Sequence, residues 1–157
     1  MKSSIKKGFG FGLTSGIITT IGLIVGLYYG TNSEKIVIGG ILIIALADSL
    51  SDALGIHISE ETHNENHKDI WEATLSTLFF KFVFAISFIV PFLIFSLSTA
   101  VVTSIVWGLF LIFLFSVYLA RVNKKSSIKV VSEHLIIAVV VIIATCFIGR
   151  WINHFFQ

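Results

Sequence analysis

Five long apolar stretches run through this sequence of 157 residues, and they restrict the folds open to it. The stretches cover about residues 9–29, 36–58, 73–97, 100–120 and 135–152. Each approaches or exceeds the roughly 20 apolar residues with which a helix crosses a bilayer. Hydrophobic residues make up 55% of the chain, which is more apolar surface than a soluble domain of this length can bury. The sequence therefore predicts an all-α, polytopic membrane protein with a bundle of five transmembrane helices.

The basic residues set the expected orientation of this bundle. If five helices alternate across the membrane, one side receives Lys2, Lys6, Lys7, Lys68, Arg121, Lys124, Lys125 and Lys129. The other side receives Lys35 and Arg150. Because cytoplasmic loops carry an excess of lysine and arginine, we expect a cytoplasmic N-terminus and a C-terminus outside. The connections are short, so we expect one membrane domain over residues 1–157, with residues 59–72 as a short acidic, histidine-bearing cytoplasmic connection.

Two aspartates interrupt the second apolar stretch. Asp48 and Asp52 are four residues apart, so they share one face of a helix. At 1.5 Å per residue, Asp52 lies roughly 9 Å and Asp48 roughly 15 Å from the cytoplasmic end of that helix. The same count places Lys81 about 12 Å deep in the third helix and Ser15 about 10 Å deep in the first. Ionisable groups at such depths mark ion or proton paths, so these four residues are predicted to form a membrane site at one level.

A polar segment leads from the cytoplasmic side to these aspartates. His63 and His67 are four residues apart, so on one helix both imidazoles would reach one metal ion. Together with His57, Glu60 and Glu61 they are predicted to collect cations at the mouth of the path. Mixed imidazole and carboxylate ligands suit divalent ions such as Fe, Mn or Zn. The alternative is a solvated polar loop that only ends two helices.

Glycines recur at every fourth position in the first stretch. They form two sets, Gly8, Gly12, Gly16 and Gly22, Gly26, Gly30. Small residues at this spacing let another helix approach closely, which predicts tight packing here, including packing at a dimer interface. The compatible alternative is that this helix forms a close-packed polar wall of a transport path.

Two segments carry a family resemblance. FGLTSGIITTIGLIVGL, residues 11–27, resembles the first helix of the vacuolar iron transporter family, and SDALG, residues 51–55, resembles that family's Ser-Met-x-x-Gly segment. Five helices with a cytoplasmic N-terminus also match. The family's helix 1 aspartate aligns with Ser15, its helix 2 methionine with Asp52, and an earlier acidic residue with Ile44. The family's large cytoplasmic metal-binding domain is reduced here to Ser59–Glu72, so the chain resembles a short form.

The resemblance implies a homodimer that moves Fe²⁺ or Mn²⁺ out of the cytosol with proton coupling. We accordingly expect a divalent-cation transporter in which Asp48, Asp52 and Ser15 bind the ion. Lys81 would pair with an aspartate when the site is empty. The alternative is a structural or other transport role, in which Asp48, Asp52 and Lys81 form a buried ion-pair network without a transported metal.

Other classes of function are less compatible with the sequence. No HExxH or GxSxG motif is present, so we expect no enzyme activity. A net charge of +2 does not indicate a nucleic-acid partner. We expect the lipid bilayer and metal ions as partners, and no tightly bound cofactor besides the transported cation. A chain of this size without a recognisable targeting sequence fits a prokaryotic plasma membrane.

Overall fold

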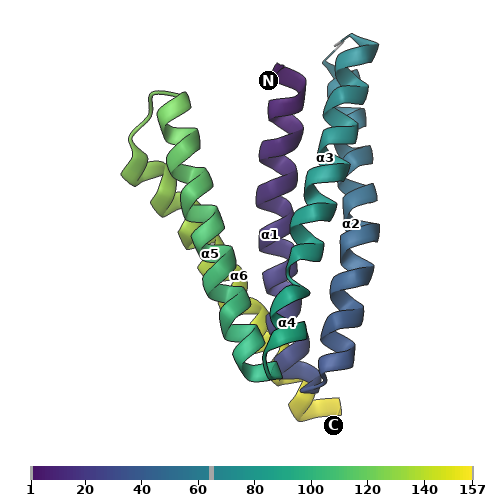
Figure 1. Cartoon of the computed structure of the whole chain (residues 1–157), viewed down its shortest axis with the longest axis vertical. Coiled ribbons are helices and arrows are strands. Elements are labelled where there is room, and N and C mark those ends of the chain that lie inside the picture. Colours follow the sequence, from purple (N-terminus) through teal and green to yellow (C-terminus); the bar gives the residue numbers. More distant parts are fainter. Residues whose placement is uncertain (1, 64–65, 157) are drawn as a thin grey trace. The chain divides into compact units, whose positions relative to one another are not determined.

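The computed structural model describes residues 2–63 and 66–156, and 92% of these described residues are helical (Figure 1). The helices are α1 (Ser3–Thr31), α2 (Glu34–Thr62), α3 (His67–Ser87), α4 (Val90–Ile94), α5 (Leu97–Val122) and α6 (Ser127–Phe156). Within the described ranges, five helical segments are long and apolar enough to cross a membrane, with α3 and α4 together forming the third. The predicted all-α fold with five such segments is confirmed, while membrane insertion and orientation stay predictions.

The helices extend further than the apolar stretches. The segment expected as a connection over residues 59–72 is largely helical, because α2 continues to Thr62 and α3 begins at His67. Residues 64–65 of that segment lie outside the described residues. Asn66 begins α3 by accepting a hydrogen bond from the Lys68 backbone N–H at 3.4 Å. Helical hydrogen bonding does not require apolar side chains, so hydropathy alone underestimates the lengths of these helices.

The break between α3 and α4 lies just before Pro91, a residue that lacks a backbone donor. The α3 helix ends at Ser87, and the Phe88 N–H bonds to the Ala85 carbonyl at 3.2 Å in a tighter final turn. Pro91 lies in the first turn of α4, where its missing N–H removes no helical hydrogen bond.

The chain divides into two compact units, which we describe separately. The first contains Met1–Thr20 and Gly39–Phe88, and therefore the first part of α1, most of α2 and α3. The second contains Ile21–Ile38 and Ile89–Gln157, and therefore the end of α1, the start of α2 and helices α4 to α6. The single membrane domain expected over residues 1–157 stays a prediction.

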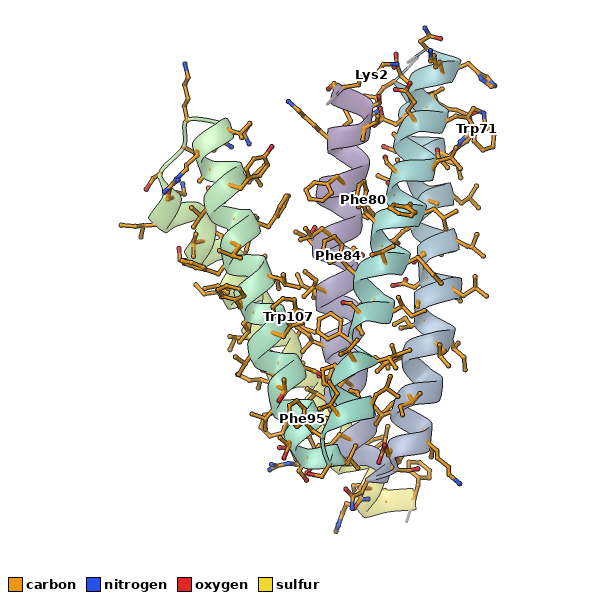
Figure 2. The ribbon with its side chains drawn as sticks, in the orientation of Figure 1. Lys2, Trp71, Phe80, Phe84, Phe95 and Trp107 are labelled. Atoms are coloured by element: carbon orange, nitrogen blue, oxygen red, sulfur yellow. The ribbon has the colours of Figure 1, made fainter. Side chains whose placement is uncertain are left out.

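In the first unit, α1 packs closely against α3. A Cβ atom on Gly12 would lie 2.8 Å from the Thr77 carbonyl oxygen, and one on Gly8 would overlap Ser76. Phe80 of α3, which is labelled in Figure 2, packs edge-to-face on Phe9 of α1, with ring centres 4.8 Å apart. Contacts advance along both helices together, so α1 and α3 run parallel, as alternating membrane spans require.

In the second unit, the other glycine set of α1 faces α6. A Cβ atom on Gly22 would lie 2.9 Å from Val141, and Gly149 of α6 meets the α1 backbone at Gly26 and Gly30. The glycine spacing therefore serves helix packing inside one chain, against α3 in the first unit and against α6 in the second. The predicted homodimer stays a prediction.

Candidate functional site

The side chain of Lys81 is the centre of the candidate site. Lys81 lies on α3 in the first unit and is 1% exposed. Its ammonium nitrogen donates to Ser15 Oγ at 2.9 Å and lies 2.6 Å from Asp48 Oδ2. It also pairs with Asp52 Oδ2. The ammonium group donates hydrogen bonds to Ser15 and Asp52, whereas Asp48 Oδ2 is an ion-pair partner that accepts no hydrogen bond from the described residues.

Ser15 completes the network between α1 and α2. Its hydroxyl donates to Asp52 Oδ2 at 2.7 Å while its oxygen accepts from Lys81. The structure thus brings together Ser15, Asp48, Asp52 and Lys81, the four residues predicted to share one level. Their role in binding an ion stays a prediction.

The glycines of α1 explain why Lys81 reaches these oxygens. A Cβ atom on Gly16 would lie 3.0 Å from the Lys81 carbonyl oxygen and 3.3 Å from its Cα atom. The α3 backbone therefore lies directly against α1 at the level of the site. Asp48 and Asp52 reach the same point from α2 because residues four apart lie on one helix face.

The site carries two carboxylates and one ammonium group. The side chain of Asp48 is 28% exposed and that of Asp52 is 22% exposed, so both carboxylates keep a partly open side. If this level lies within a bilayer, only paired charges are tolerated there. The oxygens thus form a cradle that already holds one cation, the Lys81 ammonium.

The residues predicted to collect metal at the mouth do not converge. His63 directly follows the end of α2, and its Nδ1 lies 2.7 Å from the Ser59 carbonyl oxygen, whereas His67 opens α3 beside the Trp71 ring. The two histidines do not share a helix, so the expected i, i+4 pair on one helix does not form. Asn66 starts a new helix between them.

The other predicted mouth residues have separate partners. Glu60 is 9% exposed and binds Lys7 Nζ at 2.9 Å. His57 Nδ1 lies 3.0 Å from Thr74 Oγ1, and its Nε2 lies 3.5 Å from Glu61 Oε1. Across residues 2–63 and 66–156, no three His, Cys, Asp or Glu side chains are grouped closely enough to hold a metal ion.

Lysines of the N-terminal helix region form contacts that the sequence analysis missed. Lys2 Nζ lies 2.6 Å from Glu72 Oε1, and Ser4 donates to Glu72 Oε2 at 2.8 Å. The hydrogen bond that Lys2 donates to Glu72 raises the pKa of Lys2 above its ordinary value of 10.5. Opposite charges at neighbouring helix ends were the available signal, because the predicted topology places residues 2–7 and 59–72 on one side.

The second unit holds a separate polar pair. Ser116 is buried on α5, donates to the Ile112 carbonyl oxygen at 2.6 Å and lies 2.8 Å from His134 Nδ1 on α6. No sequence pattern predicts this pair, because it depends on how α5 and α6 face each other. Arg150 lies 4.7 Å from the ring centre of Tyr29.

The fold and site together define an all-α protein with helices compatible with membrane insertion and a buried, charged, three-helix contact among them. Comparisons with family models, curated proteins and solved structures gave no match. The resemblance to vacuolar iron transporters therefore stays a prediction from residues 11–27 and 51–55.

Proposed function

We propose that this chain is an integral membrane protein that transports divalent cations, Fe²⁺ or Mn²⁺, through the oxygens of Ser15, Asp48 and Asp52. The observation that supports the proposal is the convergence of these three oxygens on the Lys81 ammonium. That ammonium occupies the position that a transported cation would take. Lys81 would hold the carboxylates when no ion is bound and move aside when one arrives.

The ligand chemistry favours hard cations. All three oxygens belong to carboxylate or hydroxyl groups, which are hard ligands. Hard oxygen ligands suit Mn²⁺ better than the softer sulfur of a thioether does. With Lys81 in place the two carboxylates leave one negative charge unbalanced. A divalent ion in place of the ammonium would balance both carboxylates, and the exchange then requires that the displaced Lys81 ammonium reaches water or another partner.

The remaining parts of the proposal come from the sequence. Positive charge at residues 2–7, 68 and 121–129 supports a cytoplasmic N-terminus. The resemblance to vacuolar iron transporters supports export from the cytosol, proton coupling and a homodimer, here in a prokaryotic plasma membrane. At the mouth of the path, the Lys7–Glu60 and Lys2–Glu72 ion pairs would open, so that the two glutamates can bind incoming cations.

Cation flux into proteoliposomes tests the proposal. We expect Asp52→Asn and Asp48→Asn each to reduce Mn²⁺ uptake at least tenfold, because each removes one of two charged ligands. Glu133→Gln is the matched control, since it neutralises an exposed carboxylate on α6 and should leave uptake unchanged. Undiminished uptake in both aspartate variants would remove the site from the transport path.

A structural ion-pair network is the second candidate function. Two observations favour it: Lys81 forms ion pairs with both Asp48 and Asp52 and a hydrogen bond to Ser15, and the described residues contain no metal-ligand cluster. Thermal unfolding with and without Mn²⁺ separates the two candidates. A bound ion stabilises the folded state by about 2.7 kcal/mol at a hundredfold excess over its Kd, whereas a purely structural network gains nothing.

A further inference from the structure

We propose that the α5–α6 turn of the second unit binds the headgroup of an anionic phospholipid, with one acyl chain in the adjoining groove. This inference rests on membrane insertion and on the orientation proposed above. It does not depend on cation transport, so the two proposals can fail separately.

The groove lies between the end of α5 and the start of α6. Its volume is about 590 Å³, and its apolar wall consists of Phe113, Val117, Ile128, Val131 and Leu135. From Phe113 to Arg121 the groove follows about 12 Å of α5, at 1.5 Å per residue. Ile128 at its polar end is 84% exposed, which leaves an apolar side chain without cover in this chain. The groove therefore has room and lining for a hydrocarbon chain.

The segment at one end of this groove is rich in basic residues. Arg121 lines the groove, and Lys124, Lys125 and Lys129 follow within eight residues, all of them exposed. Glu133 is the one acidic residue of the segment 121–135. Four positive charges beside one negative charge produce a local field that attracts anions, and the apolar groove begins where these charges end.

The turn between the helices holds these charges in a defined arrangement. Lys124 adopts a left-handed conformation with φ of 52°, and the Lys125 N–H bonds to the Ala120 carbonyl at 2.9 Å. This six-to-one hydrogen bond closes the end of α5. The two lysines are thus part of an ordered helix end rather than a loose tail.

The ligand follows from this combination of surfaces. A cationic end and an apolar groove match an amphiphile that carries negative charge at one end. Arginine binds phosphate oxygens through paired N–H donors, and lysines add charge at the membrane surface. The positive-inside rule places the turn at the cytoplasmic leaflet, where anionic lipids supply such phosphates.

Native mass spectrometry of the full-length protein in neutral detergent tests this proposal. The probes are phosphatidylglycerol and the zwitterionic phosphatidylcholine. We expect tighter binding of phosphatidylglycerol, and about fivefold weaker binding for each charge removed in the variant K124Q/K125Q/K129Q. Raising the salt concentration should weaken binding in the same direction.

Two further variants separate the parts of the site. K35Q/R150Q removes two basic residues from the opposite membrane side and should leave phosphatidylglycerol binding unchanged. Val131→Trp fills the groove and should weaken binding with all four charges intact. Equal affinity for the two lipids, insensitivity to the triple substitution, or equally tight binding of inorganic phosphate alone would overturn the proposal.

Discussion

The substitution Lys81→Met isolates the energetics of the buried cluster. Methionine is unbranched and of similar length, so it keeps most of the packing of the lysine stem while removing the charge. Lys81 is 1% exposed and pairs with both Asp48 and Asp52. The variant leaves two carboxylates four residues apart, facing each other without a counter-ion.

Removing one partner of a buried ion pair costs about 3–5 kcal/mol. The partial exposure of the two carboxylates, 28% and 22%, favours the lower part of that range. For a chain of this length 1 kcal/mol corresponds to roughly 2–4 °C in Tm, so a cost of about 3–4 kcal/mol should lower the Tm of Lys81→Met by about 6–16 °C.

The assay is thermal unfolding of the purified protein in detergent at neutral pH. The variant K81M/D48N/D52N should recover most of the lost stability, because it contains no unpaired charge. Additivity of the single and combined substitutions would show that the residues do not interact. A Tm of Lys81→Met within 2 °C of the original protein would refute the cluster as a stabilising contact.

The same variant also tests ion binding. With the ammonium gone, the two carboxylates and Ser15 Oγ are left for a divalent cation. We therefore expect Mn²⁺ to raise the Tm of Lys81→Met more than that of the original protein. Equal shifts in both proteins, or none, would contradict the idea that Lys81 occupies the cation position.

Two further predictions concern packing in the first unit. Gly12→Ala places a Cβ atom 2.8 Å from a backbone oxygen of α3 and should destabilise the protein by about 1–3 kcal/mol, whereas Gly39→Ala meets nothing within 4 Å and should stabilise its helix by up to about 1 kcal/mol. The opposite order in detergent unfolding would show that α1 and α3 are not in close contact. Thr20→Val should raise the free energy of unfolding by about 1 kcal/mol, because the buried Thr20 hydroxyl has no hydrogen-bond partner among the described residues. Thr19→Val should not raise it, because this substitution removes a hydrogen bond of 2.8 Å to the Ser15 carbonyl oxygen. Similar unfolding free energies for these two variants would contradict the hydrogen-bond assignment.

Several features of this protein follow from local sequence properties alone. Hydropathy located all five long apolar segments. The four-residue spacing of Asp48 and Asp52 placed them on one face, and counting along the helices placed Ser15 and Lys81 at their level. Each of these is a property of one helix or of helix length, so no knowledge of neighbouring helices was needed.

Helix rotation and separation decided the remaining features, and these depend on contacts distant in sequence. Glycines of α1 bring the α3 backbone close enough for Lys81 to bind oxygens of two other helices. Packing between helices distant in sequence also brings Lys7 within hydrogen-bond distance of Glu60. The start of α3 at Asn66 separates His63 from His67. Sequence periodicity determined which residues share a face. Only the packed helices determined which face meets which, because side-chain partners lie on different helices and their distances are set by the whole unit.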